Sequence, residues 1–329
     1  MRPADRPRRA VLKWSLRQRS RRVRRHRMEG RRRRRLPPVS VLPTLCTLGN
    51  LIAGFAAIHY AAKPVDYAGP WNWTGLTFAA VLIFLGMVFD AVDGSLARLT
   101  RSTTDLGAHL DSLADMVTFG IAPAFMTVVL VGLYVTDGST AVIIGPEADS
   151  NFGRIIWGVA AVYVSCAALR LARFNVETPS AAASDHRTFS GLPSPGAAGA
   201  VASLILLHQH LEANFDEEVP QAFVRAAAMG IPFITLLCAV AMVSSLPYGH
   251  VINQYLRGRR SFTYIVWIVI PLVLLIWFFP FVVAVGFCTY VLSAPVQSIW
   301  KRLRHGRAKV HAAMNREETG RESGDEPAG

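Results

Sequence analysis

Long apolar stretches separated by polar connections recur along this chain between residues 40 and 300. A helix needs about 20 consecutive apolar residues to cross the hydrocarbon core of a bilayer. We predict membrane-spanning helices at 40–62, 74–98, 105–134, 153–175, 192–209, 222–246, 261–279 and 281–299. The last two divide one long apolar run near Pro280. The pattern therefore predicts an all-α, polytopic integral membrane bundle of eight helices, or of seven if that run is a single kinked helix.

The charges of the connecting segments favour the even number of spans. Segments 63–73, 135–152 and 210–221 carry eight acidic residues against the single base Lys63, whereas the alternate connections carry arginines. Lys and Arg accumulate in cytoplasmic loops, and both ends of this chain are basic. We therefore expect a protein of the cell inner membrane with both termini in the cytoplasm, and with the polar residues near 90–115 at the cytoplasmic surface.

Most of the net charge of +13 lies in the N-terminal tail, whose first 35 residues hold 17 Lys or Arg. Such a tail can bind nucleic acid, or it can lie on anionic lipid next to a first membrane span. We favour the lipid interpretation over a nucleic-acid partner. The expected organisation is a basic, disordered tail at 1–38, a membrane domain at 39–250, a further transmembrane hairpin at 251–300 and a polar tail at 301–329.

Four aspartates lie within or at the ends of two neighbouring apolar segments. Asp90 and Asp93 are three residues apart, and Asp111 and Asp115 are four apart, so each pair shares one face of its helix. An aspartate near the centre of a membrane helix costs roughly 2.5–3.5 kcal/mol, so this group needs compensating cations. Two facing carboxylate pairs form an all-oxygen site, which suits Mg²⁺ or Mn²⁺ better than zinc.

Small residues and one arginine accompany the acids. Gly94 and Ala97 share the face of the first aspartate pair, and Gly107 lies one turn before the second. Small residues in membrane helices commonly serve helix packing. Glycine costs about 1 kcal/mol in a helix interior, however, and its place beside the acids suggests clearance for a bulky ligand. Arg98 can pair with a phosphate, so these residues together predict a site for a metal-bound diphosphate.

The whole pattern resembles the signature of the CDP-alcohol phosphotransferase family, D-x-x-D-G-x-x-A-R, eight residues, then G-x-x-x-D-x-x-x-D. The matching positions are Asp90, Asp93, Gly94, Ala97, Arg98, Gly107, Asp111 and Asp115. The resemblance implies an enzyme with a CDP-linked donor, two divalent ions held by the four aspartates, and a homodimeric assembly. It implies that Asp115 takes the proton from the acceptor hydroxyl. The same resemblance assigns the other seven matching residues to CDP binding.

Four further stretches resemble the phosphatidylserine synthase branch of this family, as does the continuation of the signature to Ala124. They are L-P-T-L-C-T-L-G-N-L-I-A-G from Leu42, A-L-R-L-A-R-F-N from Ala168, F-S-G-L-P-S-P from Phe189 and M-V-S-S-L-P-Y from Met242. The resemblance implies transfer of a phosphatidyl group from CDP-diacylglycerol to L-serine, giving phosphatidylserine and CMP. It also places Thr47 and Asn50 near the site.

The residue types of the stretch that begins at Ala168 suit an amino-acid acceptor. Arginine binds a carboxylate through two parallel hydrogen bonds, so we expect Arg170, together with Arg173 and Asn175, to bind serine. Arg173 can equally extend to lipid phosphates, and that alternative stays open. A different acceptor, glycerol 3-phosphate first, is the alternative within the family. A cation transporter is the alternative from another class, although its acids would be spread through the membrane depth rather than gathered at one edge.

Overall fold

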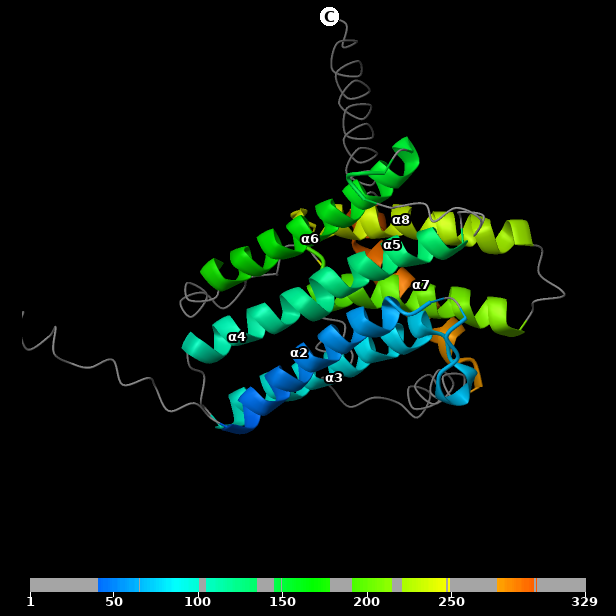
Figure 1. Ribbon diagram of the computed structural model, residues 1–329. Helices are drawn as coiled ribbons and strands as arrows, with labels where there is room; N and C mark the ends of the chain where they lie inside the picture. Colours follow the sequence, from blue (N-terminus) through cyan, green and yellow to red (C-terminus); the bar gives the residue numbers. More distant parts are fainter. Residues whose placement is uncertain are drawn as a thin grey trace, which may run out of the picture. The chain divides into compact units, whose positions relative to one another are not determined.

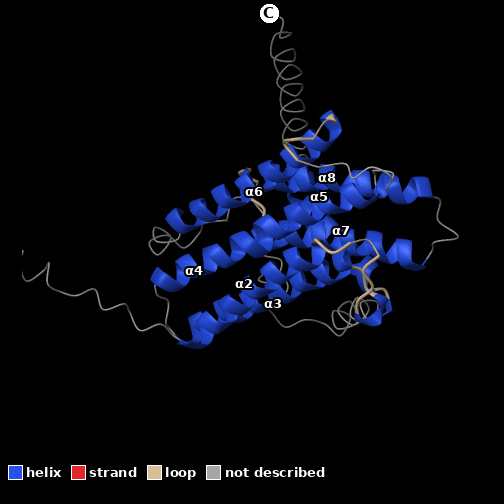
Figure 2. Cartoon of the chain, in the orientation of Figure 1, coloured by secondary structure: helices blue, strands red, loops and turns tan. Residues whose placement is uncertain are grey.

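The computed structural model describes residues 41–64, 66–100, 105–134, 145–148, 150–177, 191–214, 221–246, 248, 277–298 and 300. Every regular element in these ranges is helical (Figure 2), which confirms the predicted all-α class. The expected basic tail at 1–38, most of the expected span at 261–279 and the polar tail beyond 300 lie outside the described residues. The proposed domain boundaries therefore stay predictions.

The described elements follow one another as a series of helices (Figure 1). They are α2 (Val41–Ala61), the 3₁₀ turn η2 (Pro70–Asn72), α3 (Gly75–Thr100), α4 (Asp105–Asp115), the π-helix η3 (Met116–Ile121), α5 (Ala122–Tyr134), α6 (Asn151–Glu177), α7 (Ser194–Asn214) and α8 (Gln221–Val243). A further helix spans Phe279–Ser298 and is called the C-terminal helix below.

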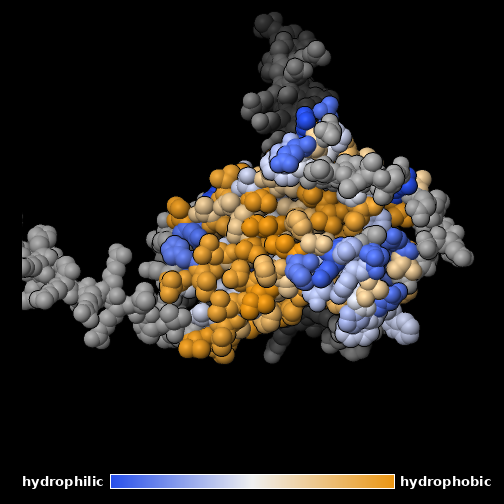
Figure 3. Space-filling view, in the orientation of Figure 1, coloured by the Kyte–Doolittle hydropathy of each residue, from blue (hydrophilic) through white to orange (hydrophobic). Residues whose placement is uncertain are grey.

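Six of the described helical segments are long and apolar enough to cross a membrane: Val41–Ala61, Gly75–Leu96, Leu106–Tyr134, Asn151–Val176, Ala222–Val243 and Phe279–Ser298. Large apolar side chains such as Ile52, Phe55 and Phe233 are exposed on these helices. Figure 3 shows a broad, continuous apolar surface on one face, with hydrophilic residues at its edges. Such a surface is stable against lipid rather than water, as expected for an integral membrane protein.

Helix α7 differs from the other expected spans, because it is absent from these six. Its sequence includes Ser203, His208 and Gln209, which lower its hydropathy, yet all three side chains are buried in the protein. The helix packs against both α3 and α8. A helix that is enclosed by other helices contacts little lipid, so it does not need a uniformly apolar surface.

Small residues let the helices around the acidic segment approach closely. A Cβ added at Gly54 would lie 2.3 Å from the Thr118 hydroxyl oxygen, and one at Gly86 would lie 2.6 Å from the Thr118 methyl group. Close backbone approach of this kind stabilises helix association within membranes. Helices α2, α3 and η3 are therefore in direct contact immediately beside the second aspartate pair.

The expected span at 105–134 forms as α4, η3 and α5 in succession, roughly in line in Figure 1. The π-helical turn has a local cause, because Pro123 has no N–H to donate to the carbonyl oxygen of Phe119. That oxygen instead accepts a hydrogen bond of 3.1 Å from the Tyr163 hydroxyl. π-helical turns frequently occur at functional sites, and this one begins directly after Asp115.

Hydrogen bonds from a turn at Gly191 hold the start of α7 against the end of α8. Gly191 has φ +94°, its N–H donates to the carbonyl oxygen of Leu246 at 2.9 Å, and the N–H of Leu192 donates to Ala241 at 3.0 Å. A Cβ at Gly191 would lie 2.5 Å from the carbonyl oxygen of Met242. Only glycine fits this turn without strain, so two of the stretches identified in the sequence are fixed against each other.

Candidate active site

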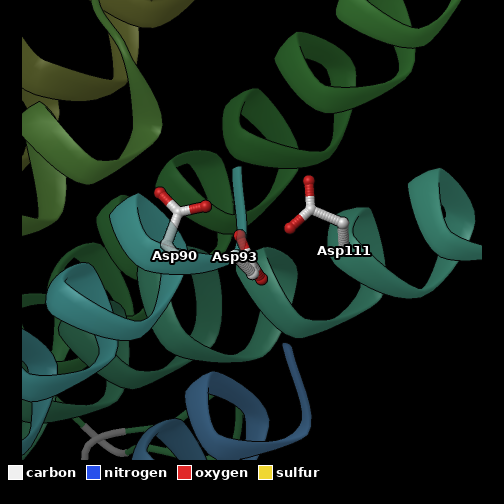
Figure 4. A group of neighbouring side chains, drawn as sticks. All are labelled: Asp90, Asp93 and Asp111. Carbon is white, nitrogen blue, oxygen red and sulfur yellow. The ribbon is translucent and has the colours of Figure 1, made fainter. Parts of the chain in front are cut away.

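Three of the four predicted acids converge between α3 and α4. Asp90 and Asp93 on α3 and Asp111 on α4 each offer a carboxylate oxygen, and these oxygens all lie within 4.8 Å of one another. Figure 4 shows the three side chains on the facing sides of the two helices. The spacing of three residues on α3 presents both carboxylates toward the neighbouring helix, as the sequence predicted.

The fourth acid, Asp115, lies one helical turn beyond Asp111 and is not part of this group of three. Its side chain is only 8% exposed, and it accepts a hydrogen bond of 3.0 Å from the amide nitrogen of Asn50. Asp115 remains close enough to the other three acids to interact with them electrostatically. The structure thus arranges the predicted set as three converging carboxylates and a deeper fourth.

Helix α2 supports the site from one side. The Thr47 hydroxyl donates to Asp93 at 2.8 Å, and Asp93 is 5% exposed. Asn50 is fully buried, and its backbone carbonyl oxygen accepts a hydrogen bond of 2.8 Å from Thr118 in the π-helical turn. Thr47 and Asn50 are three residues apart on one face of α2, so each contacts a different aspartate. Both residues that were expected near the site therefore lie there.

The donor set fits a divalent cation. Asp111 Oδ1 and Asn50 Oδ1 are buried oxygens with no hydrogen-bond partner among the described residues. Unpaired buried oxygens are uncommon and require an explanation, and cation binding would supply one. Converging carboxylates repel one another unless cations neutralise them, and hard oxygen ligands suit Mg²⁺, Mn²⁺ or Ca²⁺. This cluster could bind a metal.

The small residues of the signature are only partly described. A Cβ built on Gly94 would have no neighbouring atom within 4 Å, so open space adjoins the first aspartate pair, as expected for a position that clears a ligand. Gly107 lies in α4 one turn before Asp111. The side chains of Ala97 and Arg98 lie outside the described residues, although their backbone continues α3. Their expected contacts with nucleotide stay predictions.

The three residues expected to bind serine all lie on α6, and two of them, Arg170 and Asn175, contact different helices. Arg170 donates from Nη1 to the Ser194 hydroxyl of α7 at 2.9 Å, and its Nε is buried without a partner among the described residues. Asn175 donates to the Ser112 hydroxyl of α4 at 2.9 Å. Arg173 is exposed, which leaves its alternative role at the lipid surface open.

Two serines that the sequence did not single out are the hydrogen-bond partners of Arg170 and Asn175. Ser112 lies between the two aspartates of α4 and exchanges hydrogen bonds with Asn175, and Ser194 accepts the Arg170 bond at the start of α7. Arg170 is also within electrostatic range of Asp115. Ser112 and Ser194 both occur in the motif stretches, but their partners are 63 and 24 residues away along the chain.

The fold and the site together define a class of protein. It is a membrane-spanning helical bundle in which carboxylates converge between α3 and α4. The chain belongs to the CDP-alcohol phosphatidyltransferase family, whose sequence model matches residues 40–240. The resemblance seen in the signature from Asp90 to Asp115 is thereby confirmed. Because the family consists of enzymes, the cation-transporter alternative is no longer supported.

Several relatives of this chain carry the names of serine-transferring members of the family. The CDP-diacylglycerol–serine O-phosphatidyltransferase of Helicobacter pylori strain J99 is 33% identical over 214 residues, which cover 64% of this chain and 73% of the relative. The Bacillus subtilis strain 168 protein of the same name is 35% identical over 157 residues, or 48% of this chain and 71% of the relative. The archaetidylserine synthase of Methanothermobacter thermautotrophicus is 29% identical over 212 residues, covering 64% and 70%.

Proposed function

We propose that this chain is a CDP-diacylglycerol–serine O-phosphatidyltransferase, which produces phosphatidylserine and CMP. The observation that carries the acceptor assignment is the placement of Arg170, whose guanidinium is bound to Ser194 and lies within electrostatic range of Asp115. An acceptor that carries both a hydroxyl and a carboxylate can present the first to Asp115 and the second to Arg170. The names of the relatives from Helicobacter and Bacillus support the same acceptor.

We infer the roles of the chain's own residues from the described contacts and from the resemblance to the family signature. Asp115 takes the proton from the serine hydroxyl, while the Asn50 amide fixes the orientation of its carboxylate. The open space beside Gly94 accommodates the nucleotide, and Arg98 pairs with phosphate. Asp90, Asp93, Asp111 and Asp115 are the proposed ligands of two Mg²⁺ or Mn²⁺ ions. When bound, such ions neutralise the donor diphosphate and stabilise the departing CMP.

The acceptor is tested directly by product analysis. Purified protein in lipid nanodiscs is incubated with CDP-diacylglycerol, Mg²⁺ or Mn²⁺, and one of L-serine, glycerol 3-phosphate or inositol, and the lipid product is identified by mass spectrometry. We expect phosphatidylserine and CMP in equal amounts with serine, and little product with the other acceptors. Efficient phosphatidylglycerophosphate formation without phosphatidylserine would replace the proposed acceptor with glycerol 3-phosphate.

We also propose that both termini and the aspartate site face the cytoplasm, on the basis of the alternating loop charges. In a cysteine-free background, single cysteines at positions within 139–150 and 212–218 should react with a membrane-impermeant maleimide in intact cells. A cysteine within 253–260 should react only after the cells are permeabilised. Labelling of the 253–260 position in intact cells would contradict both the eight-span topology and the cytoplasmic site.

A further inference from the structure

The C-terminal helix lies beyond residues 40–240, the part of the chain that the family model matches, yet it packs against the first turns of α7. A Cβ added at Gly196 would lie 2.8 Å from the Tyr290 ring, and one at Gly199 would lie 2.2 Å from the Phe287 ring. The Phe287 ring also lies 5.9 Å from the ring of Phe84 on α3. Gly196 and Gly199, one turn apart on α7, therefore leave room for the Tyr290 and Phe287 rings of the C-terminal helix.

Contacts on a second side fix the position of Tyr290. Its ring centroid lies 5.8 Å from that of Tyr248, and the Tyr248 hydroxyl donates a hydrogen bond of 3.0 Å to the carbonyl oxygen of Val291. Tyr248 follows the segment that is hydrogen-bonded to the Gly191 turn. The Tyr290 ring is thus held between the start of α7 and the chain that follows α8.

This position brings Tyr290 close to the proposed acceptor site. Gly196, which the Tyr290 ring covers, is two residues from Ser194, the partner of Arg170. Arg170 lies within electrostatic range of both Tyr290 and Asp115. The guanidinium therefore lies near both the proposed proton acceptor and a phenol, and its buried Nε has no partner among the described residues.

The groups gathered here suit a small carboxylate. A guanidinium can bind it with two donors, the Ser194 hydroxyl that accepts from Arg170 still has its own proton to donate, and a phenol adds another donor. Helix α7 begins at Ser194, and the positive end of a helix dipole attracts an anion. A tyrosine that only filled space against Gly196 would not need its hydroxyl in an apolar helix, where a phenylalanine would pack as well.

We propose that Tyr290 determines acceptor specificity, because its hydroxyl acts with Arg170 and Ser194 to bind the serine carboxylate. This inference rests on the proposed function and extends it, because it assigns part of the acceptor site to a helix outside the family match. Asp115 then binds the hydroxyl end of serine, and the C-terminal helix closes the carboxylate end.

The test compares Tyr290→Phe with Tyr248→Phe in the full-length protein. Tyr290→Phe keeps the ring against Gly196 and removes only the hydroxyl, so the KM for serine should rise about tenfold, the loss expected for one hydrogen bond to a charged group. The KM for CDP-diacylglycerol should stay within about twofold of wild type, because the donor site lies on α3 and α4. Serinol has no carboxylate, so wild type and Tyr290→Phe should use it with the same low efficiency.

The matched control removes a hydroxyl from the neighbouring ring. Tyr248→Phe loses the bond to Val291 but keeps the ring contact that holds Tyr290, so it should lower the thermal unfolding temperature while changing the KM for serine by less than about twofold. An unchanged serine KM in Tyr290→Phe, or an equal rise in both variants, would overturn the role of Tyr290 and leave the proposed function intact. A wild-type protein that makes no phosphatidylserine would instead disprove the proposed function, and this inference with it.

Discussion

Asp111→Asn is expected to lower kcat about a thousandfold, because a catalytic metal supplies several kcal/mol of transition-state stabilisation and each 1.36 kcal/mol corresponds to about a tenfold change in rate. The substitution keeps the shape of the side chain and removes its charge. Asp111 is the one member of the converging group on α4, and its Oδ1 has no hydrogen-bond partner among the described residues. Asp90→Asn and Asp93→Asn should also impair transfer and donor binding.

Two measurements separate loss of metal from loss of folding. The wild-type protein should lose activity when stripped with a strong chelator and regain it with Mg²⁺ or Mn²⁺. Mn²⁺ binding followed by electron paramagnetic resonance should weaken in Asp111→Asn, while the helical content by circular dichroism stays unchanged. Asp66→Asn is the matched control, since Asp66 is an exposed acid in the segment between α2 and α3, and it should behave as wild type.

Persistent activity in the chelator-stripped protein would contradict the metal site. A second informative outcome is a variant that binds Mn²⁺ normally but fails to turn over. That result would assign Asp111 to the nucleotide rather than to a metal. The proposed mechanism requires that both metal binding and transfer decline together.

The aspartate site could be predicted from the sequence because its geometry is local. Residues three or four apart lie on one face of a helix wherever the helix is, so the two pairs on α3 and α4 could be placed without any tertiary information. Only their facing arrangement depended on how the helices pack. The family signature added that information, and the converging oxygens of Asp90, Asp93 and Asp111 agree with it.

Contacts across the bundle could not be predicted in the same way. Pro123 indicates a break in helical hydrogen bonding, but the sequence does not show that Tyr163 satisfies the freed carbonyl oxygen of Phe119. Tyr290 lies outside every motif stretch, and its proximity to Arg170 depends on the glycines of α7. The span at 192–209 was predicted from a long apolar stretch, whereas the polar residues within α7 are tolerated because the helix is buried among other helices.

Arg170→Lys is expected to raise the KM for serine about tenfold to a hundredfold. The substitution keeps the positive charge but loses the planar, bidentate arrangement of donors. A hydrogen bond to a charged group contributes about 1.5–3 kcal/mol, which corresponds to that range of KM. Affinity for CDP-diacylglycerol should change little, because the proposed donor contacts are on α3 and α4 whereas Arg170 is on α6.

The comparison that identifies the role of Arg170 uses two acceptors and a second arginine. Serinol has no carboxylate, so wild type should use it poorly, and Arg170→Lys should impair its use far less than that of serine. Arg154→Lys is the matched control near the other end of the same helix, where the exposed side chain donates to the carbonyl oxygen of Ala148, and it should leave the serine KM unchanged. If serine and serinol lose activity equally in Arg170→Lys, the arginine stabilises the Ser194 contact and the surrounding helices, and the serine carboxylate must bind elsewhere.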